Sequence, residues 1–214
     1  MTGYASIHGT DKDDHIDTTA FSDRNDYVNA RDGNDTISTG GGNDTIHAGS
    51  GKDLVYAGSG NDTIFGDAAQ DTLYGGSGND FIDGGNTNDQ LYGESGNDRL
   101  IGGQGEDRLT GGTGNDTLTG DGPGAGGSTK QDVFYYESNF GDDIITDFDL
   151  SRDTLEIREN INGSSIDDPS GLAAYITEVS GNAVISFSNG DSITLQGVSR
   201  ADLLDGLDDV VNIV

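Results

Sequence analysis

The sequence has no cysteine and few basic residues, and each shortage excludes a class of protein. Without cysteine, no disulfide framework can form. The 10 lysines and arginines stand against 39 aspartates and glutamates, which gives a formal net charge of −29. Because a surface of this sign repels nucleic acids and anionic membranes, we expect neither of them as a partner.

Long apolar runs, a secretory leader and catalytic motifs are missing as well. No segment is long and apolar enough to cross a membrane. Residues 1–10 have neither the basic region nor the apolar core of a signal peptide, so an exported protein would need another secretion signal. His8, His15 and His47 form no HExxH motif, and no GxSxG motif stands between a strand and a helix. We therefore expect no catalytic site.

The chain instead contains a nine-residue unit that occurs ten times without interruption in residues 30–119. The clearest copies are GGSGNDFID, residues 75–83, and GGTGNDTLT, residues 111–119. Place 8 is aliphatic in every copy, and place 6 is always aspartate. Acids at such fixed intervals indicate cation sites rather than the disorder that a high charge alone would suggest. The aspartates are Asp35, Asp44, Asp53, Asp62, Asp71, Asp80, Asp89, Asp98, Asp107 and Asp116.

The chemistry of one unit follows from its residue types. Glycines at places 1, 2 and 4 allow a tight turn with positive φ, which directs carbonyl oxygens inward. The place-6 aspartate adds a charged oxygen, and ligands that are all oxygen suit Ca²⁺ better than zinc or copper. Places 7–9 form a short strand whose middle side chain points inward. Because one unit buries little, the units must stack to build a continuous aliphatic core.

This unit resembles the nonapeptide of the repeats-in-toxin (RTX) family. The resemblance covers residues 9–119 well and the rest of the chain more loosely. It implies an all-β fold, namely a parallel β-roll or solenoid in which two successive units make one turn and calcium lies between turns on the same side. The tail LDDVVNIV, residues 207–214, is similar to the C-terminal signals of RTX proteins exported by type I secretion.

Odd and even units then form two files on opposite sides of the roll. Five turns in each file leave four gaps, so the two files predict roughly eight calcium ions. Ala69 and Thr87 replace the place-4 glycine in the middle of one file, where positive φ would carry a steric cost, and we expect weaker sites there. The place-4 glycines expected at the sites are Gly33, Gly42, Gly51, Gly60, Gly78, Gly96, Gly105 and Gly114.

The copies before residue 30 are poor. Residues 9–17 and 21–29 carry Lys12 and Arg24 at place 4, where glycine is expected. We expect calcium to be weak or absent there, and we expect these copies to cap the stack.

After residue 119 the repeat gives way to a glycine-rich loop with Pro123. We place a domain boundary at residue 131, with a calcium-binding roll in residues 1–131 and a mainly β C-terminal cap with the secretion signal in residues 132–214. Strands are predicted for residues 143–148, 153–158, 175–179, 183–187 and 192–196. The side chains expected to seal the roll are Phe134, Phe148, Leu155, Ile157, Phe187 and Leu195.

Local motifs add detail to the cap. Asn189-Gly190 between two alternating runs favours a hairpin. Ser199 with Asp202 favours a capped helix that continues to Leu207. In a separate stretch, residues 147–153, three aspartates are either another calcium site or solvated turn residues; they are Asp147, Asp149 and Asp153.

Tyr56, Tyr74 and Tyr92 occupy place 9 and recur every 18 residues, which predicts an outward ladder on neighbouring strands. The ladder either packs across strands, for roughly 0.2–1 kcal/mol per pair, or docks a sugar polymer or another domain. Arg99 and Arg108 stand in consecutive units and are expected on opposite faces, so they form no common basic patch.

The repeats and the tail together favour a non-catalytic calcium-binding module that folds outside a Gram-negative bacterium and supports type I secretion and stability of an exported protein. Two alternatives are a polysaccharide-binding (alginate-type) accessory module of a secreted carbohydrate-active enzyme and a part of a surface adhesin. The expected partners are calcium ions, the type I secretion machinery, and either a catalytic domain of the same parent protein or a polysaccharide.

Overall fold

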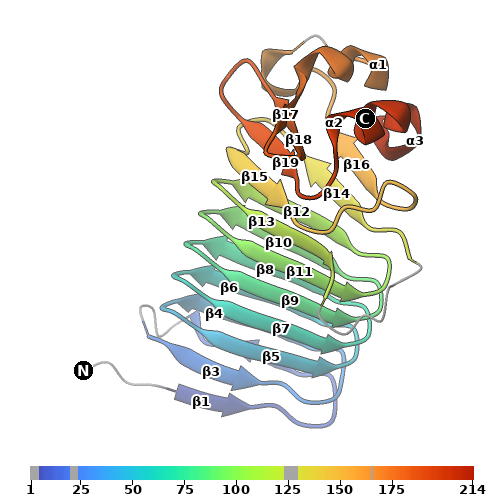
Figure 1. Cartoon of the computed structure of the whole chain (residues 1–214). Coiled ribbons are helices and arrows are strands. Elements are labelled where there is room, and N and C mark those ends of the chain that lie inside the picture. The colour runs from blue at the N-terminus through green and yellow to red at the C-terminus, as the bar shows by residue number, and fades with distance from the viewer. Residues whose placement is uncertain (1–4, 20–23, 123–129, 165) are drawn as a thin grey trace.

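In the computed structural model, two stacked walls of short parallel strands face each other and form a β-solenoid that is closed at its C-terminal end by short helices (Figure 1). The structure describes residues 5–19, 24–122, 130–164 and 166–214. The N-terminal residues 1–10, the second poor N-terminal copy and the Pro123 loop lie partly outside these residues. Within them, no helix is long and apolar enough to cross a membrane.

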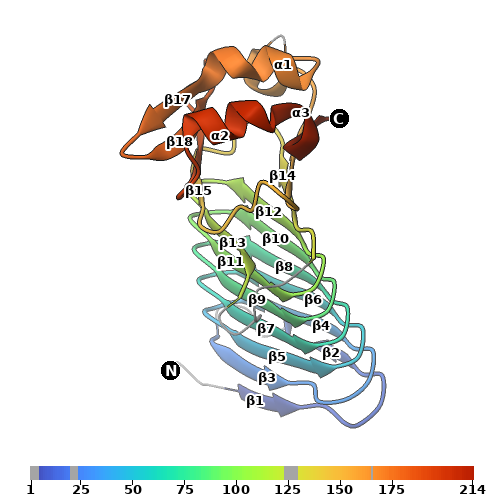
Figure 2. The same cartoon turned by 45° about the vertical axis from the view of Figure 1, so that its right-hand side comes forward.

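One wall is an 11-stranded sheet in the order β1-β3-β5-β7-β9-β11-β13-β15-β19-β18-β17. Figure 2 shows this wall beside the second one, with the helices across the top. Its strands are β1 (Ala5–His8), β3 (Asp26–Asn29), β5 (Thr45–Ser50), β7 (Thr63–Ala68), β9 (Phe81–Asn86), β11 (Arg99–Gln104), β13 (Thr117–Asp121), β15 (Asp142–Ile145), β19 (Ser192–Leu195), β18 (Asn182–Ser186) and β17 (Ile176–Val179).

The second wall is a nine-stranded, parallel sheet in the order β2-β4-β6-β8-β10-β12-β14-β16-β20. Its strands are β2 (His15–Asp17), β4 (Thr36–Gly41), β6 (Leu54–Ser59), β8 (Thr72–Ser77), β10 (Gln90–Ser95), β12 (Arg108–Thr113), β14 (Val133–Tyr136), β16 (Thr154–Ile157) and β20 (Val211–Ile213).

Strand register confirms that two units make one turn. Ile46 pairs with Ile64, and Ile64 pairs with Ile82, so residues 18 apart in sequence lie side by side. The place-8 residues of all ten repeats are completely buried in one continuous core. This stacking of identical positions is what lets units that bury little alone form a stable core together.

The strands are longer than the prediction of places 7–9. In the middle of the roll each has six residues and runs through places 1–3 of the following unit, as in Thr63–Ala68. The place-1 glycines also differ from the prediction, because Gly75 and its equivalents do not adopt positive φ, whereas glycines at places 2 and 4 do. A Cβ on Gly75 would lie 2.4 Å from Asp80 Oδ2, so place 1 requires a small residue for close packing.

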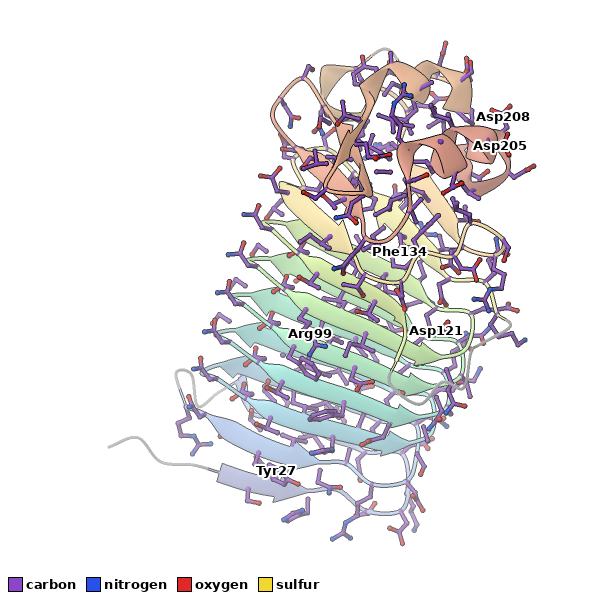
Figure 3. The ribbon with its side chains drawn as sticks, viewed as in Figure 1. Tyr27, Arg99, Asp121, Phe134, Asp205 and Asp208 are labelled. Carbon is purple, nitrogen blue, oxygen red and sulfur yellow. The ribbon has the colours of Figure 1, made fainter. Side chains whose placement is uncertain are left out.

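The C-terminal region continues both walls past residue 131. β14 and β16 extend the nine-stranded sheet, and β15 and β19 extend the other. The predicted strands are present with ends within a residue or two, except that β15 ends at Ile145 and not at residue 148. The six side chains expected to seal the roll are all buried in the common core. Figure 3 shows Phe134 at this junction.

The β18–β19 hairpin confirms the Asn189-Gly190 signal, although its loop is longer than two residues because Ser186 pairs with Ser192. Ser199 caps α2 (Arg200–Asp205), which ends before Leu207; Gly206 separates it from α3 (Leu207–Val210). Four further features were not predicted: the antiparallel pairing of β17 with β18, and the helical segments η2 (Ile161–Gly163), α1 (Pro169–Leu172) and η3 (Ala173–Tyr175). The strand in the tail, β20, which pairs with β16, was not predicted either.

Candidate calcium sites in the turns

Places 4–6 of each repeat form the turn that carries the chain from one wall to the other. The turns of even units, such as residues 42–44, connect the nine-stranded sheet to the 11-stranded sheet. The turns of odd units connect the two sheets in the opposite direction. The two predicted files of aspartates therefore lie on opposite edges of the roll.

A carboxylate ladder runs along each edge. The backbone N–H of every repeat aspartate donates to Oδ1 of the aspartate one turn later, at 2.7–2.9 Å. All ten side chains are at most 3% exposed. The second carboxylate oxygen, Oδ2, is buried without a hydrogen-bond partner in every one of the ten. Buried charged oxygens of this kind require a compensating cation or proton.

Main-chain oxygens approach the same turns. Gly60 at place 4 has φ 128°, and a Cβ added to it would lie 1.8 Å from the carbonyl oxygen of Gly42, one turn earlier. The same close approach joins Gly78 to Gly60 and Gly96 to Gly78. Among the described residues, none of these three carbonyl oxygens accepts a hydrogen bond. At these three positions glycine is therefore needed both for its φ and for the space that the preceding carbonyl occupies.

The donor set is thus carboxylate and carbonyl oxygen, which is the ligand chemistry that Ca²⁺ prefers. Among the described residues, no group of three or more Asp, Glu or His side chains comes together in a metal-sized cluster. The residues present fit a calcium ion that takes carboxylate oxygens from place 6 and carbonyl oxygens from the glycine-rich turns.

Burial and mutual repulsion change the acidity of the ladder when no cation is bound. Burial, opposed by the hydrogen bond from Asp53 N–H and reinforced by the charge of Asp53, raises the pKa of Asp71 to about 8. The same combination raises the pKa of Asp89 to about 8 and, in the other file, that of Asp62 to about 7. Ionised, these groups need a cation that neutralises them.

The middle of the odd file departs from the pattern, as the sequence predicts. Ala69 and Thr87 adopt positive φ, at 77° and 75°, although both have a Cβ. The place-4 glycines have φ between 120° and 148°. The turns at Ala69 and Thr87 are therefore strained and differ in backbone rotation from the turns beside them.

The poor N-terminal copies have their carboxylates engaged within the chain. Asp14 accepts hydrogen bonds from the backbone and hydroxyl of Thr10, and Asp26 forms an ion pair with Arg24 at 3.4 Å. Weak or absent calcium in these copies stays a prediction.

The three aspartates of residues 147–153 do not come together as a cation site. Asp147 accepts from the N–H groups of Gly120 and Asp121. Asp149 binds Ser151 and Arg152, and Asp153 accepts from the N–H groups of Asp132 and Asp149. They act as turn and capping residues.

The structure confirms the tyrosine ladder. Tyr56 and Tyr74 stack with ring centroids 4.9 Å apart, and Tyr74 and Tyr92 stack at 4.6 Å, with interplanar angles of 10° and 8°. The rings cover one another's faces, so mainly their edges face outward, which favours the packing alternative over sugar stacking. As predicted, Arg99 on β11 and Arg108 on β12 belong to opposite walls.

Two ladders were missed by sequence reasoning. The first is at place 5, where the N–H of Asn61 donates to Oδ1 of Asn43, and the N–H of Asn79 to Oδ1 of Asn61, each 18 residues earlier. The asparagines at place 5 are visible in the sequence. The second is a row of rings on the 11-stranded sheet, from Tyr27 through the β5 and β7 rings to Phe81, against which Arg99 lies at 5.4 Å. Figure 3 shows Tyr27 and Arg99 on this wall.

The fold and its turns define a class of protein, the parallel β-solenoid with oxygen-lined turns. The model of the "RTX calcium-binding nonapeptide repeat" matches four times, at residues 22–55, 47–82, 56–91 and 92–122. The repeat region of this chain therefore belongs to the RTX family, whose repeats bind calcium and form a structural rather than a catalytic module.

A similar solved structure is the "Crystal structure of extracellular lipase LipA from Serratia marcescens", with 21% identity and a TM-score of 0.48. The alignment covers 100% of this chain and 40% of that chain, so this chain spans well under half of the lipase's length. The search of curated proteins gave no match.

Proposed function

We propose that this chain is a calcium-triggered folding module of a protein exported by type I secretion. One observation carries the proposal: all ten repeat aspartates have a buried Oδ2 atom without a hydrogen-bond partner. When calcium is scarce, as in the cytosol, these charges repel across neighbouring turns and oppose folding. Extracellular calcium modules bind at about 10⁻⁴ to 10⁻³ M, so the roll would fold after export.

The ions occupy the gaps between turns of the same file. Place-6 carboxylates and glycine carbonyls of adjacent turns supply the ligands, which gives roughly eight ions for ten repeats. Because each ion joins two turns, filling one gap orders the turn needed for the next, and folding is cooperative. The sites beside Ala69 and Thr87 bind least tightly, since both turns are strained.

The partner and location follow from the same proposal. The C-terminal tail serves as the uncleaved signal for the secretion machinery of a Gram-negative bacterium, and the folded roll remains extracellular beside any catalytic domain of the parent protein. Residues 1–131 act as the roll and residues 132–214 as its cap. The export role is tested by replacing the tail residues 207–214 and measuring the extracellular fraction in cells with a type I exporter; unchanged export would contradict it.

The calcium-triggered fold is tested by circular dichroism. Titration of the chelator-treated chain with Ca²⁺ should produce a cooperative gain of β structure, whereas Mg²⁺, which demands a compact octahedral site, should not. Asp62→Asn should raise the calcium midpoint. Asp205→Asn is the matched control, because this exposed aspartate lies on α2 at the surface of the cap (Figure 3). A spectrum rich in β structure in EDTA at neutral pH would contradict the proposal.

A further inference from the structure

The family match ends at residue 122, and residues 120–137 break the nine-residue interval, although Gly141, Asp143 and Ile145 keep the residue types of places 4, 6 and 8. The backbone at residues 141–143 rebuilds the repeat turn. Gly141 has φ 92°, and a Cβ added to it would lie 1.9 Å from the carbonyl oxygen of Gly114, as at a place-4 glycine. The N–H of Asp142 donates to Asn115 Oδ1 at 2.9 Å, which continues the place-5 ladder. This turn therefore stacks on the last repeat in the way that one repeat stacks on another.

The carboxylate ladder continues into the same turn. The N–H of Asp116 donates to Asp143 Oδ1 at 2.8 Å, although the two residues are 27 apart in sequence instead of 18. Both side chains are 1% exposed. Oδ2 of Asp116 and Oδ2 of Asp143 are each buried without a hydrogen-bond partner. Asp143 thus has the environment of the ten repeat aspartates, although it lies outside the uninterrupted repeats and outside the family match.

A tyrosine adds an observation that is independent of the acids. Tyr136 is 2% exposed, and its hydroxyl oxygen is buried without a hydrogen-bond partner. Its ring packs edge-to-face on Phe140, with centroids 4.8 Å apart. Burial raises the pKa of this hydroxyl, and the charges of Asp143 and Asp116 are close enough to raise it further. A buried phenol hydroxyl without a hydrogen-bond partner is an unsatisfied polar group, which a bound ion or water would satisfy.

We propose that Asp116 and Asp143 hold one further calcium ion between the last repeat and the turn at residues 141–143, with the Tyr136 hydroxyl as a neutral oxygen of the same site. The proposal rests on the calcium function proposed above and extends it to a segment outside the repeats. The carbonyl oxygen of Gly114 supplies a main-chain ligand, as the place-4 carbonyls do between repeats. All of these donors are oxygen, in keeping with Ca²⁺.

The site would link docking of the cap to calcium. Gly141 leads directly into β15, which contains Asp143 and joins the repeat strand β13 on one side and the cap strand β19 on the other. Without the ion, two buried carboxylates would face each other at this junction. Loading of the site therefore favours a cap that is packed on the end of the roll.

The experiment uses the full chain and counts bound calcium per chain by mass spectrometry at a buffered, saturating free calcium concentration. Asp143→Asn should bind one ion fewer than the wild type. Asp142→Asn is the matched control, since Asp142 is adjacent but exposed and its carboxylate accepts from the Ser192 hydroxyl. Hydrogen exchange in residues 136–146 gives a second measurement, because calcium should slow it in the wild type and in Asp142→Asn but much less in Asp143→Asn.

Tyr136→Phe keeps the ring and removes only the hydroxyl, so it tests the site if Asp143→Asn fails to fold. Loss of one oxygen ligand or hydrogen bond, about 1 kcal/mol, should weaken the calcium dependence of exchange in this segment about fivefold. An Asp143→Asn chain that folds and keeps the wild-type ion count would overturn the proposal. If that variant is unfolded, an unchanged calcium dependence in Tyr136→Phe would overturn it. A wild-type chain that binds no calcium would instead refute the proposed function itself.

Discussion

At place 4 of the repeat, a single dihedral angle and a single carbonyl oxygen determine which residue is tolerated. The glycines there have φ near 130°, beyond the left-handed region that other residues visit, and the preceding turn's carbonyl occupies the space of a Cβ. Thr87 fits only by a smaller rotation, to φ 75°. Position-specific strain of this kind predicts opposite effects for two substitutions.

Thr87→Gly should stabilise the calcium-loaded roll and lower its calcium midpoint. Relief of about 1–2 kcal/mol of left-handed strain exceeds the roughly 0.5–1 kcal/mol of entropy that glycine loses on folding. Urea unfolding at fixed calcium measures the first effect, and a calcium titration measures the second. A destabilised variant would show that the threonine turn is not strained.

Gly78→Ala should destabilise the roll by about 2–3 kcal/mol, because its Cβ would lie 1.8 Å from Gly60 O at φ 128°. Gly171→Ala is the control: this residue in α1 has no positive φ, and its nearest neighbour atom would be 3.9 Å from the new Cβ. Urea unfolding of both variants at saturating calcium should show a loss in Gly78→Ala alone. Equal stability of the two variants would contradict the steric account.

The raised pKa values of the ladder carboxyl groups predict how the metal-free chain responds to pH. The pKa of Asp71 and of Asp89 is about 8 and that of Asp62 about 7 in the folded chain, above the ordinary value of 3.8. Groups with a raised folded pKa stabilise the fold fully below the unfolded pKa, and this contribution disappears as pH rises through the folded pKa. In EDTA, β structure should therefore be greater near pH 4 to 5 than at pH 8, as measured by circular dichroism. No dependence on pH would contradict these shifts.

With saturating calcium the sign should reverse. Protons compete with the ion for the same carboxylates, so acidification lowers calcium affinity and with it the stability of the loaded roll. Thermal unfolding at fixed calcium across the same pH range checks the reversal.

Periodicity alone locates the ten aspartates, because a constant residue at a constant interval is visible in one sequence. The N–H to Oδ1 bonds between turns are not visible, since they depend on how closely one turn lies on the next. Asp143 escaped the sequence analysis for a related reason: extra residues between Asp116 and Asp143 break the interval, although stacking restores the geometry. A prediction of calcium sites from such a chain finds the regular sites and misses those that only the fold brings into line.

At the scale of elements, the length of each strand is set by its pairing with the neighbouring turns more than by the residue types of one unit. Places 7–9 have strand-forming residues, but places 1–3 are rich in glycine, which weakens a strand on its own. They join the strand because the identical segment one turn away offers a complete set of partners, as Gly58 pairs with Gly76. The boundaries of the strands could not be predicted from propensity for this reason, whereas the parallel stacking could.

The tyrosine ladder gives an element-scale prediction about additivity. Tyr74 stacks on two rings, whereas Tyr56 stacks on one and is 43% exposed. At about 0.5–1.5 kcal/mol for each aromatic pair, Tyr74→Leu should cost roughly twice as much stability as Tyr56→Leu. Urea unfolding at saturating calcium measures both. Equal losses would mean that the stacks contribute little beyond burial of each ring alone.

At the scale of the whole molecule, the two ends of the roll differ. The C-terminal end is continued by β14, β16 and β20 on one wall and by β15, β19, β18 and β17 on the other. The predicted cap thus supplies partners for the last repeat strands as well as apolar cover. It also supplies the carboxylates that accept from the last two repeat aspartates, Asp132 for Asp107 and Asp143 for Asp116.

Deleting residues 132–214 should therefore raise the calcium midpoint for folding sharply or abolish folding. The deletion removes both ladder acceptors, leaves β12 and β13 as unpaired edges, and exposes an apolar end that lets the last turns fray. Deleting residues 1–29 should change the midpoint little, because the poor copies there engage their carboxylates within the chain and are weak nuclei. Type I export would also deliver the C-terminus first, so that the cap meets calcium before the repeats do. Circular dichroism during calcium titration compares the two truncations with the intact chain; if the repeats without residues 132–214 fold at the same calcium concentration, the cap does not nucleate the roll.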